Sequence, residues 1–233
     1  MSLIRLDKFV SVALNISRAD TKKILRDGKI MVDGVSTKKG DFKVDTETMV
    51  VKQGTEKLEY KEFIYILMNK PSGILSASND KRAKTVVDII PESLKRDGLF
   101  PVGRLDKDTT GLLIITNDGD FAHKVISPKS NIEKVYLAEL DGDITNEMIE
   151  TFKVGVVLAD GTRCMPAKLE RAGECSALIT IREGKYHQVK RMFGTVGLGV
   201  NKLHRKSIGS LSLPEDLKMG CCVELSQQDL QKI

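Results

Sequence analysis

The sequence has few cysteines, few histidines and no tryptophan. Its four cysteines form no Cys-x-x-Cys pair and no spacing typical of a zinc site. We therefore expect free, buried thiols of a reducing cytosol rather than a disulfide framework at Cys164, Cys175, Cys221 and Cys222. The three histidines lie far apart without ligand spacing, which argues against zinc; they are His123, His187 and His204.

Long apolar runs and export signals are also missing. No apolar run approaches the roughly 18 residues of a membrane span, and the first residues lack a basic region followed by an apolar one. The segments Asp106–Asp108 and Asn117–Asp120 do not follow the calcium-loop pattern. No phosphate-binding glycine loop occurs. We expect a cytoplasmic protein that contacts no membrane and holds neither a metal nor a cofactor.

Positive charge is concentrated in two regions. The chain carries a net charge of +5, yet residues 182–206 hold seven Lys or Arg residues and a single acid. Residues 1–60 hold twelve basic and nine acidic residues. Two separate basic regions indicate a polyanionic partner that is contacted at two places. On charge alone, a merely solvated surface explains the pattern equally well.

The first 60 residues predict two helices followed by strands. Apolar residues from Leu6 to Leu14 repeat at helical spacing. Ser17, with Asp20 three residues later, is typical of the N-cap of a second helix that ends at Gly28. The pair Asp33-Gly34 between apolar residues predicts a hairpin. The polar residues 54–59 then place a domain boundary near residue 60.

The remaining residues, 61–233, mix strands and helices without regular alternation. Apolar runs predict strands over 63–68, 111–116, 134–140 and 177–181. We expect a short helix over 85–90 before Pro91, and another that is capped by Asp120 and ends near Pro128. This pattern favours an α+β domain with a mixed, largely antiparallel sheet and flanking helices.

One loop carries the most chemistry-bearing residues. Residues 100–111 place charged side chains between two glycines, directly before the apolar 111–116 strand. A polar loop on a rigid strand is a usual way to present catalytic groups. The residues alone nevertheless favour a surface turn whose charges pair with one another.

Four segments, in order, resemble the motifs of ribosomal pseudouridine synthases of the small-subunit type. They are Gly-Arg-Leu-Asp-Lys-Asp-Thr-Thr-Gly-Leu-Leu over 103–113, Lys-Val-Tyr over 134–136, Glu-Gly-Lys-Tyr-His-Gln-Val-Lys-Arg-Met-Phe over 183–193, and Leu-His-Arg over 203–205 followed by Ile-Gly. Residues 1–60 resemble an S4 RNA-binding domain. The resemblance implies isomerisation of a uridine in ribosomal RNA, with 16S RNA or a partly assembled small subunit as partner.

The resemblance also assigns roles to residues. Asp106 matches the nucleophile, which would attack C1′ of the ribose or remove the proton at C2′; the sequence leaves both open. A carboxylate can begin such a reaction unaided, and because the sugar rejoins the same base at C5, no cofactor is required. Lys190 matches a cation that would keep Asp106 ionised, with Arg191 as an alternative. Tyr136 would stack on the uracil ring and help to remove the C5 proton; without the resemblance, it is a core aromatic.

The resemblance further predicts contacts with RNA. Arg104 would fill the gap left by the flipped uridine or hold nearby phosphates, and an ion pair with Asp108 is the alternative. Further candidate RNA-binding residues are Arg5, Lys8, Arg18, Lys22, Lys23 and Arg26 in the N-terminal region, and Lys185, His187, Gln188, Arg191 and Arg205 in the basic segment. With aromatics at 5% of the chain, recognition of folded RNA by shape fits better than stacking on single strands.

Other functions account for less of the sequence. A non-catalytic S4-containing assembly factor explains the basic regions but not the matches at Asp106, Tyr136 and Lys190. A glycoside hydrolase would use Asp106 and Asp108 as its acid and base, although two carboxylates on one loop have no fixed separation. A transfer RNA synthetase would require a nucleotide-binding signature. A large-subunit synthase remains an alternative within the family, and a monomer is the default expectation.

Overall fold

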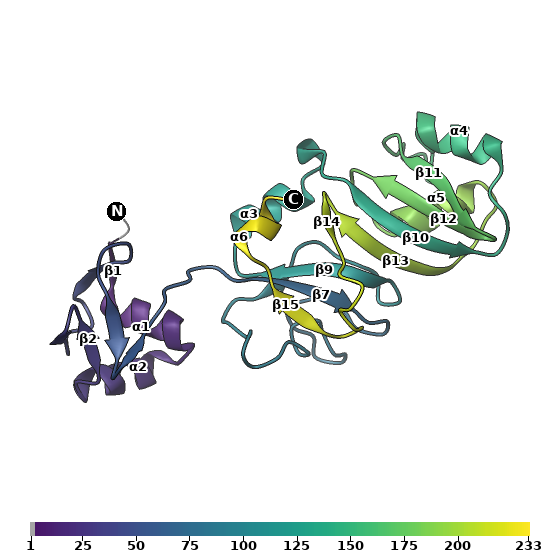
Figure 1. Ribbon diagram of the computed structural model, residues 1–233. Coiled ribbons are helices and arrows are strands. Elements are labelled where there is room, and N and C mark those ends of the chain that lie inside the picture. The colour runs from purple at the N-terminus through teal and green to yellow at the C-terminus, as the bar shows by residue number, and fades with distance from the viewer. Residues whose placement is uncertain (1–2) are drawn as a thin grey trace. The chain divides into compact units, whose positions relative to one another are not determined.

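The structure, a computed structural model, describes residues 3–233 (Figure 1). It divides into two compact units, Met1–Phe63 and Ile64–Ile233. The division falls three residues beyond the boundary that we place near residue 60. None of the helices within residues 3–233 combines the length and apolarity that crossing a membrane requires.

The first unit packs two helices against short strands. Its elements are β1 Leu3–Arg5, α1 Leu6–Leu14, α2 Arg18–Arg26, β2 Ile30–Val32, β3 Val35–Ser36, β4 Lys43–Asp45, β5 Val51–Gln53 and β6 Glu56–Lys57. As predicted, the hydroxyl of Ser17 caps α2 by accepting a bond of 3.1 Å from the amide of Asp20. Asp33 and Gly34 both have positive φ, as the tight turn between β2 and β3 requires.

The second unit is built on one mixed sheet. Its elements are β7 Tyr65–Lys70, β8 Phe100–Pro101, β9 Thr110–Thr116, α3 Gly119–Ile126, the 3₁₀ helix η1 Pro128–Ser130, β10 Lys134–Leu140, α4 Asn146–Val154, β11 Lys168–Gly173, β12 Ser176–Ile181, α5 Gln188–Thr195, β13 Val200–Ile208, β14 Leu211–Ser212, β15 Cys222–Glu224 and α6 Gln227–Leu230. The strand order is β11-β12-β10-β13-β9-β7-β15, with β14 beside β13 and β8 beside β9. Among the strands described in residues 64–233, only β9 and β13 pair in parallel. The predicted α+β fold with a largely antiparallel sheet is confirmed.

The central strands of this sheet are buried on both faces. On β9, Leu113 and Ile115 belong to one apolar cluster and Leu112 and Ile114 to another. A strand covered on both sides needs apolar residues at every position, which explains its unbroken apolar sequence. The helices α4 and α5 lie with the first cluster, through Phe152 and Phe193, whereas α3 belongs with the second (Figure 1).

The two halves of the sheet meet at a short parallel seam. Strands β9 and β13 pair through only two residue pairs, Thr110 with His204 and Gly111 with Arg205. Gly111 has a φ of +101°, and a Cβ atom there would collide with the backbone of Arg205. Glycine is therefore required at this position for the strands to approach each other.

Three local predictions need correction. The first strand of the second unit runs over Tyr65–Lys70 and not 63–68, so Lys70 ends a buried strand. Residues 85–90 form turns and no helix, because the amide and hydroxyl of Thr85 both bond to the carboxylate of Asp88. The cap of α3 is Asp118, which accepts from the amide of Phe121, and not Asp120.

Candidate active site

Asp106 lies on the loop between β8 and β9, directly before the central strand of the sheet. Its side chain is 26% exposed, so the carboxylate can meet a ligand while its loop is backed by the core residue Leu105. The hydroxyl of Ser76 bonds to both the amide and the carbonyl of Leu105, at 3.1 and 2.9 Å. The Ser76 side chain therefore fixes the backbone at Leu105, next to Asp106.

A buried lysine that the sequence analysis did not single out holds the rest of this loop. Lys70 is 0% exposed, and its ammonium donates to the carbonyl oxygens of Asp106 (3.2 Å), Lys107 (3.2 Å) and Thr109 (2.9 Å). It also donates to the carbonyl of Pro71. Burial lowers the pKa of Lys70 to about 8. The sequence signal for this residue is a charged side chain that directly continues an apolar strand.

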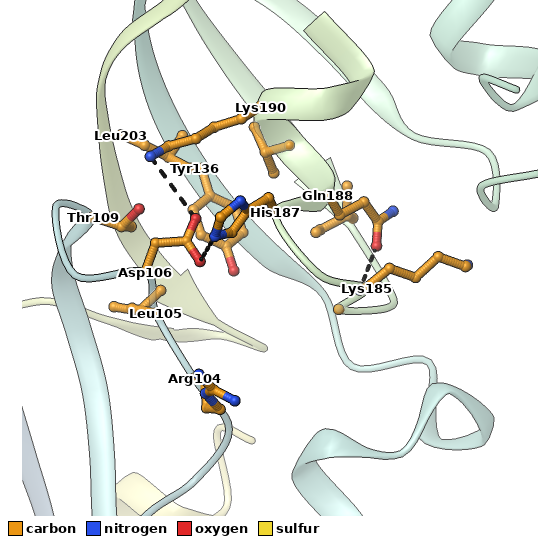
Figure 2. A pocket seen from close by; sticks show the side chains of 13 residues that line it. Arg104, Leu105, Asp106, Thr109, Tyr136, Lys185, His187, Gln188, Lys190 and Leu203 are labelled. Atoms are coloured by element: carbon orange, nitrogen blue, oxygen red, sulfur yellow. Dashed lines mark hydrogen bonds and ion pairs between the residues drawn. The ribbon is translucent and has the colours of Figure 1, made fainter. Parts of the chain in front are cut away.

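Two side chains near the start of α5 reach the Asp106 carboxylate (Figure 2). The His187 Nε2 atom lies 3.4 Å from one carboxylate oxygen, and the Lys190 Nζ atom lies 3.9 Å from the other. Both groups come from about eighty residues downstream. The predicted Asp106–Lys190 pairing is therefore compatible with the fold at ion-pair distance.

Lys190 makes its tightest contacts with the second acid of the loop. Its ammonium lies 2.7 Å from both oxygens of Asp108, which is exposed. The hydrogen bond from Lys190 holds the pKa of Asp108 below its usual value, and the positive charge of Lys190 adds to this effect. The Lys190 cation is thus shared between two carboxylates, and Asp108 does not pair with Arg104, which was the alternative from the sequence.

Tyr136 lies on β10 and is only 7% exposed. It lines the same cavity, of about 70 Å³, as Asp106, Lys190 and Leu203. Its hydroxyl accepts a hydrogen bond of 3.3 Å from the guanidinium of Arg205, which also lies 5.8 Å from the centre of the Tyr136 ring. The apolar and ionisable groups that line this cavity are the kinds of side chain that hold and orient a small organic ligand.

The structure corrects two of the predicted RNA contacts. Arg205 is 4% exposed and donates to the carbonyl of Leu112 at 2.7 Å, so it supports Tyr136 from inside the protein. Gln188 is also 4% exposed, and its side chain bonds to Glu183 and to the amide of Lys185. Both residues lie in a basic segment, and the sequence does not distinguish its buried members from its exposed ones.

Of the other RNA contacts predicted in the second unit, three line the cavity and Arg191 does not. Lys185 and His187 line the cavity, as does Arg104, whose exposed side chain lies apart from the Asp106 carboxylate in Figure 2. Lys185 forms an ion pair with Glu183. Arg191 forms an ion pair with Asp160 and so does not replace Lys190 beside Asp106.

The basic residues of the first unit are all exposed. Arg5, Lys22 and Arg26 line one open hollow, together with Lys38 and two acids. Arg5 bonds to Asp7, and Lys8 bonds to Glu62 at 2.9 Å. The remaining predicted contacts are exposed on α2 outside this hollow; they are Arg18 and Lys23.

The arrangement in the second unit suits chemistry at an electrophilic carbon. One part-exposed carboxylate faces a cavity beside a cation, an imidazole and a tyrosine. The carboxylate can serve as nucleophile or base, the cation lies at ion-pair distance from it, and the phenol can exchange a proton. Comparison with known proteins identifies the reaction. Residues 64–195 match the family model described as RNA pseudouridylate synthase.

This chain belongs to the RNA pseudouridylate synthase family. The matched residues contain Asp106, Tyr136 and Lys190. Similar curated proteins are the uncharacterized RNA pseudouridine synthase YtzG of Bacillus subtilis strain 168, 42% identical with 97% of each chain covered, and ribosomal small subunit pseudouridine synthase A of Vibrio cholerae, 40% identical with 99% of each chain covered. The predicted family is confirmed, and the protein is an enzyme that acts on RNA.

A solved pseudouridylate synthase has the same fold. Its crystal structure is 34% identical in sequence to this RNA pseudouridylate synthase, with a TM-score of 0.69, and the match covers 98% of this chain and 99% of that one. The family model begins at Ile64, so it does not include the first unit. The S4-like nature of residues 1–60 and the roles of individual residues stay predictions.

Proposed function

We propose that this enzyme isomerises a uridine to pseudouridine in ribosomal RNA of the small subunit, which is 16S RNA in bacteria. Full-length relatives named ribosomal small subunit pseudouridine synthase A support this choice: those of Vibrio cholerae and Escherichia coli are 40% and 36% identical to this chain. Naked RNA and a partly assembled subunit are both compatible with this substrate class.

We assign the first chemical step to Asp106. The observation that carries this assignment is that its carboxylate faces the cavity lined by Tyr136 and Lys190, although the three residues come from distant parts of the chain. The bond between C1′ and N1 of the uridine breaks, the base turns, and C1′ bonds to C5. The C5 proton leaves and N1 gains a proton, so the product is an isomer and no outside group is consumed.

We assign supporting roles to two other residues that line the cavity, Lys190 and Tyr136. Lys190 places a positive charge beside the carboxylate, and its second contact with Asp108 fixes where the ammonium lies. Tyr136 stacks on the uracil and takes part in removing the C5 proton, and its hydroxyl is oriented by Arg205. Buried hydrogen bonds of this kind hold a reacting group in place before the substrate arrives.

We propose that the first unit is an S4-like RNA-binding domain. The hollow lined by Arg5, Lys22 and Arg26 offers cations for phosphate contacts, which increase affinity but select little sequence. Replacing Lys22 and Arg26 together should weaken RNA binding, reduce its salt dependence and leave kcat at saturating RNA unchanged. Equal binding by this double variant and the wild type would reject the hollow as an RNA site.

The central experiment measures release of tritium from C5-labelled uridine in small-subunit RNA, without added cofactor. The wild type should release tritium in the isomerisation, whereas Asp106→Asn should bind RNA and release none. The asparagine keeps the size of the side chain but cannot serve as an anionic nucleophile or base. Normal turnover by this variant would remove Asp106 from the mechanism. Mapping pseudouridines in ribosomal RNA from cells with and without the gene identifies the target uridine and tests the subunit.

A further inference from the structure

An exposed aromatic side chain stands beside the active site. Tyr186 is 74% exposed, although large apolar rings are usually covered in a folded chain. Its ring stacks on the imidazole of His187, with centroids 3.8 Å apart and planes inclined by 20°. That imidazole in turn contacts the Asp106 carboxylate at 3.4 Å. The stacked rings of Tyr186 and His187 therefore connect the exposed surface with the Asp106 carboxylate.

The backbone under this pair is held in a conformation of high energy. His187 has a φ of +48°, which is uncommon for a residue other than glycine. The carbonyl of His187 accepts from the amide of Arg191 at 2.9 Å, and the carbonyl of Tyr186 accepts from the Arg191 side chain at 3.4 Å. Such conformations cluster at functional sites, where the surrounding structure fixes them.

A second set of contacts fixes the same turn from the other side. The buried Gln188 side chain accepts from the amide of Lys185 at 2.9 Å and donates to Glu183 at 2.8 Å. Glu183 is 5% exposed and also accepts from the amide of Met165. An exposed ring on a backbone braced in this way is already ordered, so a ligand that stacks on it loses little extra entropy.

We propose that Tyr186, stacked on His187, is a platform for the nucleobase next to the target uridine in the RNA strand. This inference rests on the proposed function and deepens it, because it assigns a substrate subsite outside the catalytic cavity. A uridine that leaves its stack exposes the faces of its neighbours, and a flat ring beside the cavity replaces the contact that is lost. The platform thereby holds the strand while the uridine lies over Asp106.

The chemistry of the surface favours a nucleobase over other ligands. Every base has a flat face that stacks on tyrosine, and such stacking tolerates any sequence. The Arg191 side chain bonds to the Tyr186 carbonyl, and the excess of positive charge over residues 182–206 favours a strand of phosphates. Tyr186 is one of few aromatic residues in this chain, so we expect one stacked base, with folded RNA still recognised mainly by shape.

Kinetics of Tyr186 variants test the platform. Tyr186→Ala should lower kcat/KM by about 10- to 100-fold, the range expected for one lost base stack, whereas Tyr186→Phe, the matched control that keeps the flat ring, should stay within about two-fold of the wild type. The thermal midpoints should agree, because the side chain is mostly exposed. Equal kcat/KM of Tyr186→Ala and wild type would overturn the proposal.

A cycle with altered RNA separates stacking from a structural effect. The RNA is a small-subunit fragment spanning the mapped uridine, with an abasic site placed in turn at each neighbouring nucleotide. At one of these positions the abasic RNA should react equally slowly with wild type and Tyr186→Ala, because the stacking partner is already absent. An undiminished ratio between the two enzymes at both positions would overturn the platform.

A fluorescent base gives a readout that does not depend on turnover. With 2-aminopurine beside the uridine, binding to Asp106→Asn should quench the fluorescence, and binding to Asp106→Asn/Tyr186→Ala should not. Equal quenching by the two variants, with equal binding of RNA, would refute the platform. If the wild type released no C5 hydrogen from small-subunit RNA, the proposed function would fail instead, which distinguishes the two outcomes.

Discussion

Replacing Lys70 with methionine tests whether a buried ammonium holds the Asp106 loop in its active geometry. Burial lowers the pKa of Lys70 from 10.5 to about 8, and at about 1.4 kcal/mol per pKa unit the charged form is disfavoured by about 3 kcal/mol. Methionine removes that cost. It also removes the Lys70 donor from four carbonyl oxygens, but those of Asp106 and Lys107 keep the backbone amides of Thr109 and Gly73 as donors.

These opposing effects nearly cancel in stability but not in activity. A buried carbonyl without a donor, such as that of Thr109, costs about 1 to 3 kcal/mol, and the part-buried carbonyl of Pro71 costs about 1 kcal/mol more. Set against the cost of about 3 kcal/mol that methionine removes, the net effect of Lys70→Met on stability is within about 1 kcal/mol of zero, so the variant should stay folded at 25 °C. The freed loop no longer fixes Asp106, and a shift of about 1 Å lowers the rate roughly 100-fold.

The assay combines urea unfolding with the tritium-release rate at saturating RNA. The matched control is Lys134→Met, which removes another buried lysine with a pKa lowered to about 8. Lys134 donates to the carbonyls of Val125 and Ile132, away from the Asp106 loop, so we expect a similar effect on stability and a rate within about three-fold of the wild type. A wild-type rate for Lys70→Met, or equal rate losses in both variants, would refute the reasoning.

Three further outcomes are expected. Because the unfolded chain holds the Lys70 proton more tightly, the contribution of this group to stability should rise with pH between about 8 and 10.5. The rate should fall above about pH 8, because the Lys70 ammonium loses a proton and with it one hydrogen-bond donor. Lys70→Met should lack this fall in a pH–rate profile. Gly111→Ala should destabilise the protein by about 3 kcal/mol or more in urea unfolding, because a Cβ collides with the Arg205 backbone; a smaller loss would mean that the seam relaxes. Asp108→Asn should lower kcat/KM far less than Lys190→Met, since the freed ammonium can move to Asp106; equal losses would mean that Asp108 itself is required.

Local chemistry made parts of the fold predictable. The Ser17 cap and the Asp33-Gly34 turn are set by neighbours within four residues, and the structure has both. The strand over 134–140 was predicted at its observed bounds, and its buried residues alternate along one face from Lys134 to Leu140. The helix expected over 85–90 failed because a side chain competed for the backbone, as Thr85 and Asp88 show.

The site was predictable only where a motif identified it. Asp106, Tyr136 and Lys190 were named from their resemblance to a family and lie around one cavity. Lys70 was missed because its partners are carbonyls from almost forty residues later, which no local pattern reveals. Arg205 was misplaced for a similar reason: its burial depends on Tyr136 and on β9, and a run of basic residues does not indicate which member faces inward.

The active site is complete only while the short pairing between β9 and β13 is kept. Asp106 is carried by the half of the sheet that contains β7 and β9, whereas Tyr136 and Lys190 belong to the half that contains β10 and β13 (Figure 1). Only two residue pairs join these halves along the strands. Parting them would leave each half with intact helices and strands but without a complete set of reacting groups. The turnover rate should therefore detect a separation of the two halves, whereas a spectrum that reports secondary structure should not.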